Sequence, residues 1–297
     1  MRRITLVTIV LAACAGSAAP ASAPSHPEVQ GSALQRNAAC EGCHADIAGE
    51  WRASLHMQSH SDPVYQRAFA LEPLAFCTRC HAPEANAESP SLEHTTIGTA
   101  CVTCHSGGPT ATSARPCAGC HEFGFPEGPG MMQLTATEHR ASTHSMTPCT
   151  TCHMPRAAGH ASHRFAASRD VDFLRQAADI RASRSGSEVL IALSPRDVGH
   201  ALPTGDIFRR LRVEVIVPGD ATTQRLAFLD RSTKSGGPDN RPFVAGAPAE
   251  VRMAIAAPGR PIAWSVTYER VEHPTSPDGS NAVVDGSIEL ASGTLAP

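Results

Sequence analysis

The chain is 297 residues long, which is enough for two domains of ordinary size. It carries 25 basic and 28 acidic residues, a formal charge of −3, and this mild acidity excludes the strongly basic surface that is typical of nucleic-acid-binding proteins. Aromatic residues make up only 4% of the chain, so side chains alone would supply two hydrophobic cores poorly, and a cofactor could fill one of them.

The N-terminus has the pattern of a secretory signal peptide. Its first three residues, MRR, are cationic, and residues 4–13 form an apolar run that is too short to span a membrane as a mature helix. The run ends in LAAC at positions 11–14, which resembles the bacterial lipobox, where the cysteine is lipidated and becomes the new first residue. Ordinary signal-peptidase cleavage after Ala18 is the alternative.

We therefore predict a leader over residues 1–13, a lipid anchor on Cys14, and a disordered tether over residues 14–35, which are rich in Ala, Ser and Pro. These features predict a protein that is secreted across the inner membrane and is periplasmic or attached to the outer membrane as a lipoprotein. Ala15 follows the cysteine, where an Asp would favour retention in the inner membrane, so the outer membrane is the expected destination.

Ten of the 11 cysteines fall into five copies of the pattern C-x-x-C-H, and the eleventh is Cys14. This pattern is typical of covalent haem c attachment, because the two thiols add to the two haem vinyl groups and the next imidazole reaches the iron as its proximal ligand. We therefore predict five covalently bound haem c groups. The predicted attachment cysteines and proximal histidines are Cys40, Cys43 and His44; Cys77, Cys80 and His81; Cys101, Cys104 and His105; Cys117, Cys120 and His121; and Cys149, Cys152 and His153.

Three other uses of paired cysteines explain this pattern less well. A secreted disulfide framework has no reason to place His after every second cysteine. Zinc sites use C-x-x-C pairs, but they do not require the next residue to be His in all five copies. A thioredoxin-like redox pair would occur once, beside a βαβ pattern that is not visible in this sequence.

Residues 36–168 are rich in Gly, Pro, Ser and Thr and contain few long apolar runs, so their side chains alone would bury a core poorly. Large flat porphyrins can supply the missing apolar surface, with short helices and loops wrapped around them. We predict that residues 36–183 form a pentahaem cytochrome c domain, mainly helical and irregular, that does not fold without haem.

Two short segments of this region are nearly the same. Residues 50–56 read EWRASLH and residues 138–144 read EHRASTH, with five of seven positions identical. Five irons need up to five distal ligands besides the proximal imidazoles, and each segment ends on a histidine. We predict bis-histidine ligation at most irons, with each segment a helical element that presents a distal ligand, His56 or His144.

Further blocks lie between and after the motifs: Trp51-x-x-Ser54-x-His56, Asp62-Pro63-Val64-Tyr65, Ile97-Gly98 before the third motif, Met154-Pro155 after the fifth, His163-Arg164-Phe165, and Val198-Gly199-His200-x-x-Pro203-Thr204-Gly205-Asp206. Together with the motifs, over roughly residues 38–215, they resemble the multihaem c-type cytochromes related to the tetrahaem electron acceptor of hydroxylamine oxidoreductase. This chain differs in having five motifs, and the last block resembles the element that opens the C-terminal β-domain of many of these proteins.

The resemblance implies a set of distal iron ligands, which are His56, His163, His200, His144 and His94. Three neighbouring histidines remain alternatives. His60 follows His56 by four residues and would share its helical face, and His160 could replace His163. His139 stands where the related segment usually has Trp, so it could replace His144, and Ser106 stands where Gly usually follows the third motif.

After residue 185 the sequence changes to alternating apolar and polar residues, with Pro-Gly and Gly-Gly turns between the runs. The predicted strands are residues 188–193, 210–217, 224–229, 250–255, 262–268 and 284–290. Six or seven such strands predict an all-β sandwich over residues 184–297 that carries no haem attachment motif. The expected fold class is therefore α+β, with a mainly helical and irregular cytochrome domain followed by a β-sandwich.

A six-coordinate iron has no open position for a substrate, so bis-histidine haems predict electron transfer and no catalytic residue. The expected partners are redox proteins or a terminal electron acceptor, with the membrane reached through Cys14 and no nucleic acid. The first alternative is an oxidoreductase of a small nitrogen or sulfur compound at one five-coordinate haem, although no C-x-x-C-K motif marks such a site. The second is a β-sandwich binding module that presents the haems to a partner.

The lipid anchor can be tested by replacing Cys14 with Ser. The variant lacks the thiol that accepts the lipid, so we expect it to move from the membrane fraction to the soluble fraction of the producing cells. Fractionation followed by haem staining measures the shift. Equal membrane partitioning of Cys14→Ser and the parent would contradict the lipobox interpretation.

Overall fold

The computed structural model describes residues 30–86, 90–105, 115–232, 237–272 and 282–297. The predicted leader, the predicted anchor Cys14, Ser106 and most of the predicted tether lie outside these ranges. Among the helices in these ranges, none is long and apolar enough to cross a membrane.

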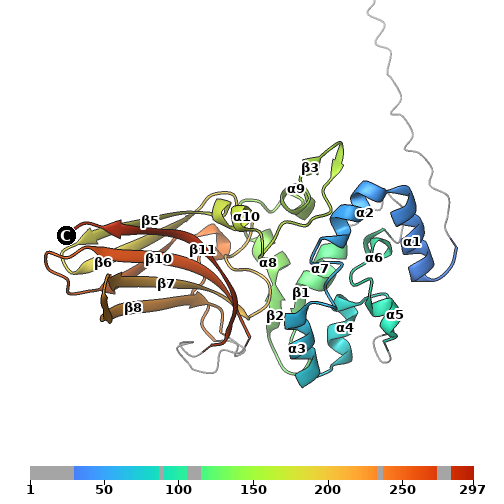
Figure 1. The fold of residues 1–297 in the computed structure, drawn as a ribbon, viewed down its shortest axis with the longest axis horizontal. Coiled ribbons are helices and arrows are strands. Elements are labelled where there is room, and N and C mark those ends of the chain that lie inside the picture. Colours follow the sequence, from blue (N-terminus) through green and yellow to red (C-terminus); the bar gives the residue numbers. More distant parts are fainter. Residues whose placement is uncertain (1–29, 87–89, 106–114, 233–236, 273–281) are drawn as a thin grey trace, which may run out of the picture.

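Residues 30–177, which we call the motif region, consist of short helices, as the sequence predicted, and of two small hairpins, which it did not predict (Figure 1). Each C-x-x-C-H motif lies on a helix or at its end. The helices are α1 (Ala33–Cys43), α2 (Ala45–Arg52), α3 (Pro63–Leu71), α4 (Ala75–His81), α5 (Leu92–Thr95), α6 (Cys101–Cys104), α7 (Arg115–His121), α8 (Thr135–Arg140), α9 (Cys149–His153) and α10 (Val171–Gln176). The hairpins pair β1 (Glu122–Gly124) with β2 (Met131–Leu134) and β3 (Arg156–Ala157) with β4 (His160–Ala161).

Helix α1 begins inside the predicted tether. The Ser32 hydroxyl accepts the backbone N–H of Gln35, and the Gln35 side chain accepts the backbone N–H of Ser32, which makes a capping box. The prediction of disorder up to residue 35 was therefore wrong at its end. The S-x-x-Q pattern provides hydrogen-bond acceptors for two backbone N–H groups and so stabilises the start of the helix. The prediction of disorder rested on the Ala- and Ser-rich composition and did not take this capping box into account.

Residues 178–297, which we call the strand region, form two antiparallel sheets (Figure 1). The strands are β5 (Ala178–Ser185), β6 (Glu188–Pro195), β7 (Arg209–Val217), β8 (Asp220–Asp230), β9 (Ala249–Ala254), β10 (Ile262–Val271) and β11 (Val284–Leu295). One sheet has the order β11-β10-β7-β8 and the other has the order β5-β6-β9.

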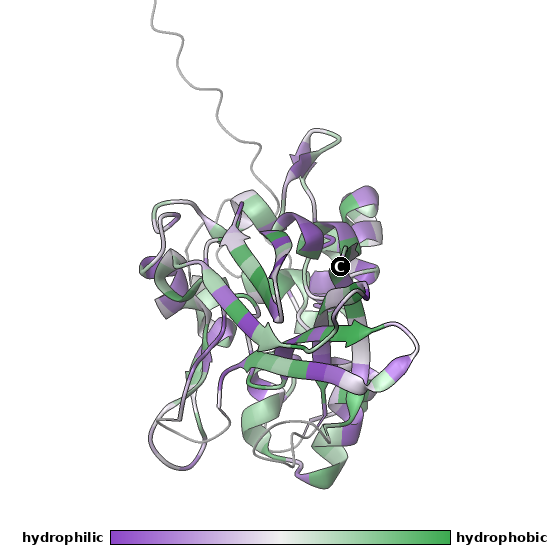
Figure 2. Cartoon of the chain, turned by 90° about the vertical axis from the view of Figure 1, so that its left-hand side faces the viewer, coloured by the Kyte–Doolittle hydropathy of each residue, from purple (hydrophilic) through white to green (hydrophobic). Residues whose placement is uncertain are grey.

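All seven of these strands contribute to one hydrophobic cluster. Side chains alternate along each strand, which is visible as bands of hydropathy in Figure 2. The central strands β6 and β7 bury every second residue, among them Ile191 and Val213, which are fully inaccessible to solvent. The motif region is different, because its own hydrophobic cluster is built around only three buried residues, Trp51, Ala100 and Val102. Side chains therefore provide a core for the strand region and very little of one for the motif region.

The six predicted strands are confirmed as β6 to β11, and one strand was missed. Strand β5 runs through the predicted domain boundary between residues 183 and 184, so the strand region begins at Ala178. The alternation in β5 is hidden in the sequence because its inward positions include two small residues, Ala178 and Ala182, beside Ile180.

The repeated segments are helical only in their first residues. Helix α2 ends at Arg52 and helix α8 ends at Arg140. His56 and His144 therefore lie on the turns that follow, and the expected helical face shared by His56 and His60 does not exist.

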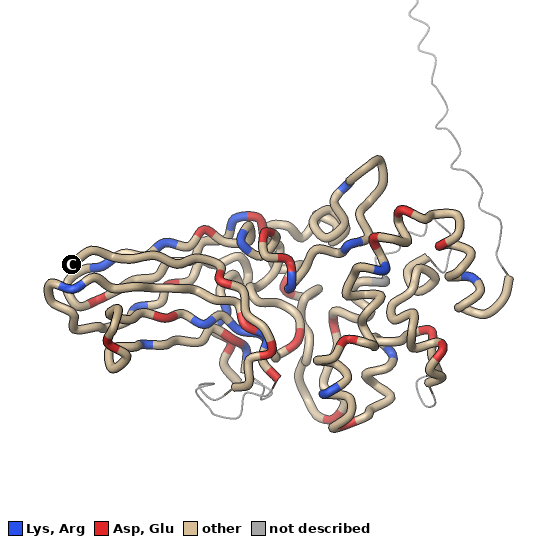
Figure 3. Tube along the Cα trace, viewed as in Figure 1, with Lys and Arg blue, Asp and Glu red and all other residues tan. Residues whose placement is uncertain are grey.

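Charged side chains connect the two regions. Arg67 on α3 donates to Glu272 at 2.6 Å and to Asp285 at 2.9 Å. Glu138 on α8 and Arg241 form an ion pair of 2.6 Å in which both side chains are buried. Acidic and basic residues are otherwise interspersed along the chain that the structure describes (Figure 3), in agreement with its small net charge.

Replacement of Ile191 by Ala tests the core of the strand region. Ile191 is fully buried between the sheets, so the lost burial and the cavity should lower the free energy of unfolding by about 2–5 kcal/mol. Leu226→Ala on β8, where the side chain is 41% exposed, should cost less than about 1 kcal/mol. Denaturant unfolding followed by far-ultraviolet circular dichroism measures both, and equal losses would contradict the assigned core.

Candidate functional site

All five motifs face a single hollow. Its lining includes all ten motif cysteines and all five motif histidines, and its volume is about 3140 Å³. A pocket for one small molecule is usually roughly 300–1,000 Å³. The hollow is therefore large enough for several cofactors, and every predicted attachment residue borders it.

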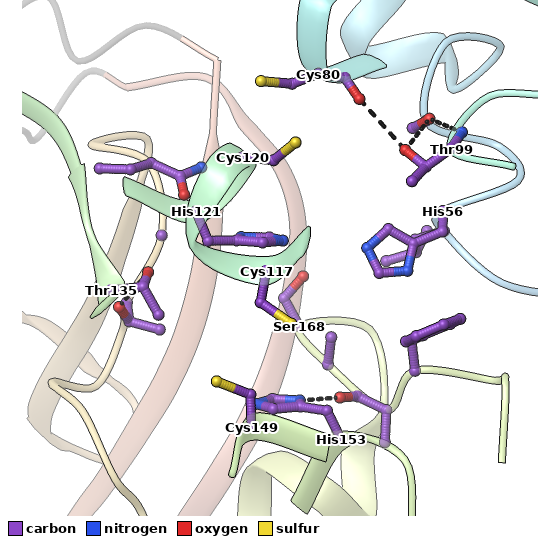
Figure 4. Close-up of a pocket in the computed structure, with 18 of the residues that line it drawn as sticks. His56, Cys80, Thr99, Cys117, Cys120, His121, Thr135, Cys149, His153 and Ser168 are labelled. Carbon is purple, nitrogen blue, oxygen red and sulfur yellow. Dashed lines mark hydrogen bonds between the residues drawn. The ribbon is translucent and has the colours of Figure 1, made fainter. Parts of the chain in front are cut away.

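The motifs neighbour one another in an order that differs from their order in the sequence. Cys80 in the second motif lies close enough to Cys120 in the fourth for the two thiols to interact. Cys117 in the fourth motif in turn lies near Cys149 in the fifth (Figure 4). The fourth motif therefore lies between the second and the fifth.

The remaining motifs join the same group from the other side. Cys104 of the third motif lies close enough to Cys117 and Cys120 of the fourth to interact electrostatically with them. Cys101 of the third motif has the same relation to Cys40 of the first. The first motif is thus beside the third, the third beside the fourth, and the fourth beside both the second and the fifth.

Three motif imidazoles each face a second imidazole from elsewhere in the chain. The ring centroids are 6.3 Å apart for His121 and His56, 6.3 Å apart for His105 and His163, and 6.2 Å apart for His153 and His200. Figure 4 shows the rings of His121 and His56 pointing toward one another.

This separation matches two ligands on opposite sides of one metal ion. An imidazole nitrogen binds a first-row metal at about 2.0–2.1 Å and lies about 1.1 Å from its ring centroid, so two trans imidazoles have centroids about 6.2–6.4 Å apart. Rings in direct stacking contact are much closer, as with Tyr65 and His81, whose centroids are 3.9 Å apart. The separation within each of the three histidine pairs is therefore the one that two imidazoles would have if they held a haem iron.

Backbone carbonyls set the tautomers of four imidazoles in the hollow. A carbonyl oxygen can only accept a hydrogen bond, so each Nδ1 carries the proton and each Nε2 keeps the lone pair that a metal needs. The Nδ1 donors and their acceptors are His81 to Ser59 at 2.6 Å, His153 to Ala166 at 2.7 Å, His163 to Ala161 at 2.8 Å and His200 to Ala201 at 3.0 Å.

Burial keeps the ligand candidates neutral. It lowers the pKa of His56 to about 4, with a smaller repulsive effect from His121 and His153. Burial is also the largest cause of the lowered pKa values of His121 and His200. Because a metal binds only the neutral imidazole, these environments suit ligands at neutral pH.

The five predicted distal ligands do not all reach the hollow. His56, His163 and His200 border it and face motif imidazoles, and His144 borders it beside Gly199. His94 lies outside it, on α5, where its Nδ1 is 2.8 Å from the Ser91 hydroxyl. The structure therefore does not support His94 as a ligand in this hollow.

The alternative histidines are also separated by position. His139 borders the hollow and, like His144, lies against Gly199. His60 packs behind two residues of the lining, Tyr65 and Phe69, and His160 is 3.3 Å from the carboxylate of Glu50. His139 thus remains an alternative to His144, whereas neither His60 nor His160 borders the hollow.

Two aromatic residues of the site had no predicted role. Phe165 lies with its ring centroid 4.3 Å from that of His56 and 5.7 Å from that of His163, so it contacts two opposed imidazoles at once. Tyr65 stacks on His81. Both lie in sequence blocks that carried the family resemblance. Because the chain has few aromatic residues, their position in these blocks was the sequence signal that could have identified them as site residues.

The ten motif cysteines are all free of disulfide bonds. Within the described ranges, no group of three or more His, Cys, Asp or Glu side chains converges as a zinc site requires.

The fold is similar to that of a known cytochrome. The crystal structure of a penta-heme cytochrome c552 from Thermochromatium tepidum matches 87% of this chain and 97% of its own, with a TM-score of 0.66 and 19% sequence identity. At this identity the match shows similarity of fold alone. No protein-family model matches the chain, and no curated protein matches its sequence.

The imidazole pairs predict which histidine replacements change the spin state of a bound haem iron. His163→Ala and His200→Ala each remove one ring of an opposed pair, so in haem-loaded protein each should convert one low-spin iron to high-spin and open it to carbon monoxide. His94→Ala serves as the control and should change nothing. Low-temperature electron paramagnetic resonance counts the high-spin irons, and an unchanged count in both variants would contradict the pairing.

Proposed function

We propose that this chain is an exported multihaem c-type cytochrome that binds five haem c groups and transfers electrons. One observation carries the proposal. Fifteen motif side chains border one hollow, and three motif imidazoles face a second imidazole at the separation of trans metal ligands. The similar structure is a penta-heme cytochrome, and the five motifs of this chain offer the same number of attachment sites.

The proposed roles of the residues follow from their chemistry. The cysteines anchor the cofactors, and the motif histidines serve as proximal ligands. His56, His163 and His200 serve as distal ligands opposite His121, His105 and His153. Bound haem supplies one-electron redox chemistry. Two imidazoles at each of these three sites leave no position for a substrate, which favours a carrier over an enzyme.

The contacts between motifs support a route for electrons through the region. The first motif neighbours the third, the third neighbours the fourth, and the fourth neighbours both the second and the fifth. Contact between attachment points keeps neighbouring cofactors close together, as fast transfer requires. The fourth motif, Cys117 to His121, is therefore the proposed junction.

The strand region is proposed to be a β-sandwich domain that closes one side of the cofactor site. Its two sheets share one core, and His200, Arg209 and Tyr268 contribute to the lining of the hollow. With the leader and Cys14, we propose a periplasmic or outer-membrane lipoprotein that exchanges electrons with redox proteins or a terminal acceptor. The small net charge gives no support for a nucleic-acid partner.

The haem content is the direct test of this proposal. Five intact motifs predict five covalent haems in the mature protein, all retained after acid-acetone extraction, with one-electron oxidation and reduction at each. A double replacement, Cys117→Ala with Cys120→Ala, removes both thioether anchors of the fourth motif and should lower the count by one. Intact-mass spectrometry measures both proteins.

Two results would contradict the proposal. One is a parent protein that carries four or fewer haems when fully matured. The other is a majority of high-spin irons with rapid turnover of a small nitrogen or sulfur compound, which would favour an enzyme.

A further inference from the structure

The two copies of the repeated segment make the same internal contact. The Ser54 hydroxyl donates to the carbonyl of Trp51 at 2.7 Å, and the Ser142 hydroxyl donates to the carbonyl of His139 at 2.9 Å. Each hydroxyl then accepts a backbone N–H from the following turn, at 3.3 Å and 3.1 Å respectively. Both copies therefore end a helix in the same way and turn the chain toward the final histidine.

Each copy is also tied to a haem-attachment motif by its arginine. Arg52 forms an ion pair with Glu41, which lies between the two cysteines of the first motif. Arg140 is 3.3 Å from Glu122, the residue directly after His121 in the fourth motif. The repeats are thus equivalent in sequence, local geometry and attachment.

The glutamate of the first copy holds the loop of a distal imidazole. The carboxylate of Glu50 accepts the backbone N–H of His163 at 2.7 Å. It is only 16% exposed, and this backbone hydrogen bond is the largest cause of its lowered pKa. The ring of His163 faces that of His105, so Glu50 is hydrogen-bonded to the backbone of the residue that carries this ring.

The glutamate of the second copy, Glu138, binds the loop that follows another predicted distal ligand, His200. Glu138 accepts the Thr204 hydroxyl at 2.6 Å and pairs with Arg241 at 2.6 Å, and Arg241 in turn donates to the carbonyl of Pro203 at 2.8 Å. Pro203 and Thr204 follow His200, whose ring faces His153, by three and four residues. Both side chains of the ion pair are nearly inaccessible to solvent.

A glycine packs against the final histidine in both copies. At Gly98 an added Cβ would lie 2.5 Å from the carbonyl oxygen of His56, and at Gly199 it would lie 3.1 Å from the Cβ of His144. Gly199 immediately precedes His200, and Phe165, which contacts His56, follows His163 by two residues. Each copy therefore lies against the loop that its glutamate holds.

We propose that Glu50 and Glu138 are equivalent positioning residues, each of which orients the distal imidazole of an iron by holding the loop that carries it, Glu50 directly through the backbone and Glu138 through Thr204 and Arg241. Glu50 positions His163 and Glu138 positions His200. The inference rests on the proposed haem-binding function. It gives the repeat a role beyond its terminal histidines, since one segment fixes an attachment motif, a distal-ligand loop and a turn together.

The first copy gives the direct test. In haem-loaded protein, Glu50→Ala removes the acceptor of the His163 N–H, so the loop loosens and the high-spin share should rise by up to about one fifth of the total iron. Glu50→Gln keeps an oxygen acceptor and should stay low-spin, while loss of the negative charge raises the potential of one haem. Asp46→Ala, an exposed acid on the same helix α2, is the matched control and should resemble the parent.

The second copy needs a paired replacement. Glu138→Ala leaves the buried Arg241 with Asp239 as its one remaining carboxylate partner among the described residues and can prevent folding. The double variant Glu138→Met with Arg241→Met removes both charges and should raise the high-spin share by the same fraction, at the iron of His153. Thr143→Ala, exposed within the same repeat, is the control.

Electron paramagnetic resonance, redox titration and intact mass together separate the outcomes. Five haems with new high-spin iron in Glu50→Ala, reversed in Glu50→Gln, support the inference. An unchanged spin count in Glu50→Ala overturns it, and so does loss of a haem from that variant, because the glutamate would then act in haem attachment. A parent without low-spin bis-imidazole iron would instead overturn the proposed function itself.

Discussion

The structure depends on one geometric constraint, which is the separation of 6.2–6.3 Å between the facing imidazole rings of three histidine pairs. Two imidazoles that held one metal ion would have this separation, and no pair is close in sequence. His121 meets His56 from 65 positions earlier, and His153 meets His200 from beyond β6. Each pair therefore brings together two segments that are distant in the sequence. These histidines and residues of the short helices line the same hollow.

This constraint explains why the two regions differ in composition. The strand region closes on a core of aliphatic side chains such as Ile191, Val213 and Val266. The motif region buries little of its own, and the lining of its hollow comes from nearly every helix. Polar links between the regions, above all Glu138 with Arg241, place the His200 loop at the edge of the hollow.

Local signals in the sequence predicted much of this protein correctly. Strict alternation located β6 to β11, because in a half-buried strand apolar and polar residues alternate along the sequence with a period of two. Alternation did not reveal β5, because small and charged residues interrupt its period of two. Composition did not reveal the start of α1, because a capping box forms a helix in residues that are rich in Ala and Ser. The repeated segments were expected to be helical to their final histidine, but each helix ends at its arginine, where the serine turns the chain.

The sequence by itself determined the five attachment motifs, because thioether attachment and proximal ligation need only residues within five positions of one another. Only the tertiary structure decided which predicted distal imidazole faces which motif, and it brought His56, His163 and His200 to the hollow while leaving His94 outside. It also decided that the fourth motif lies between the second and the fifth. These relations join residues dozens of positions apart, and their distances follow from packing and from contacts such as Glu50 with the backbone of His163, which no local pattern encodes.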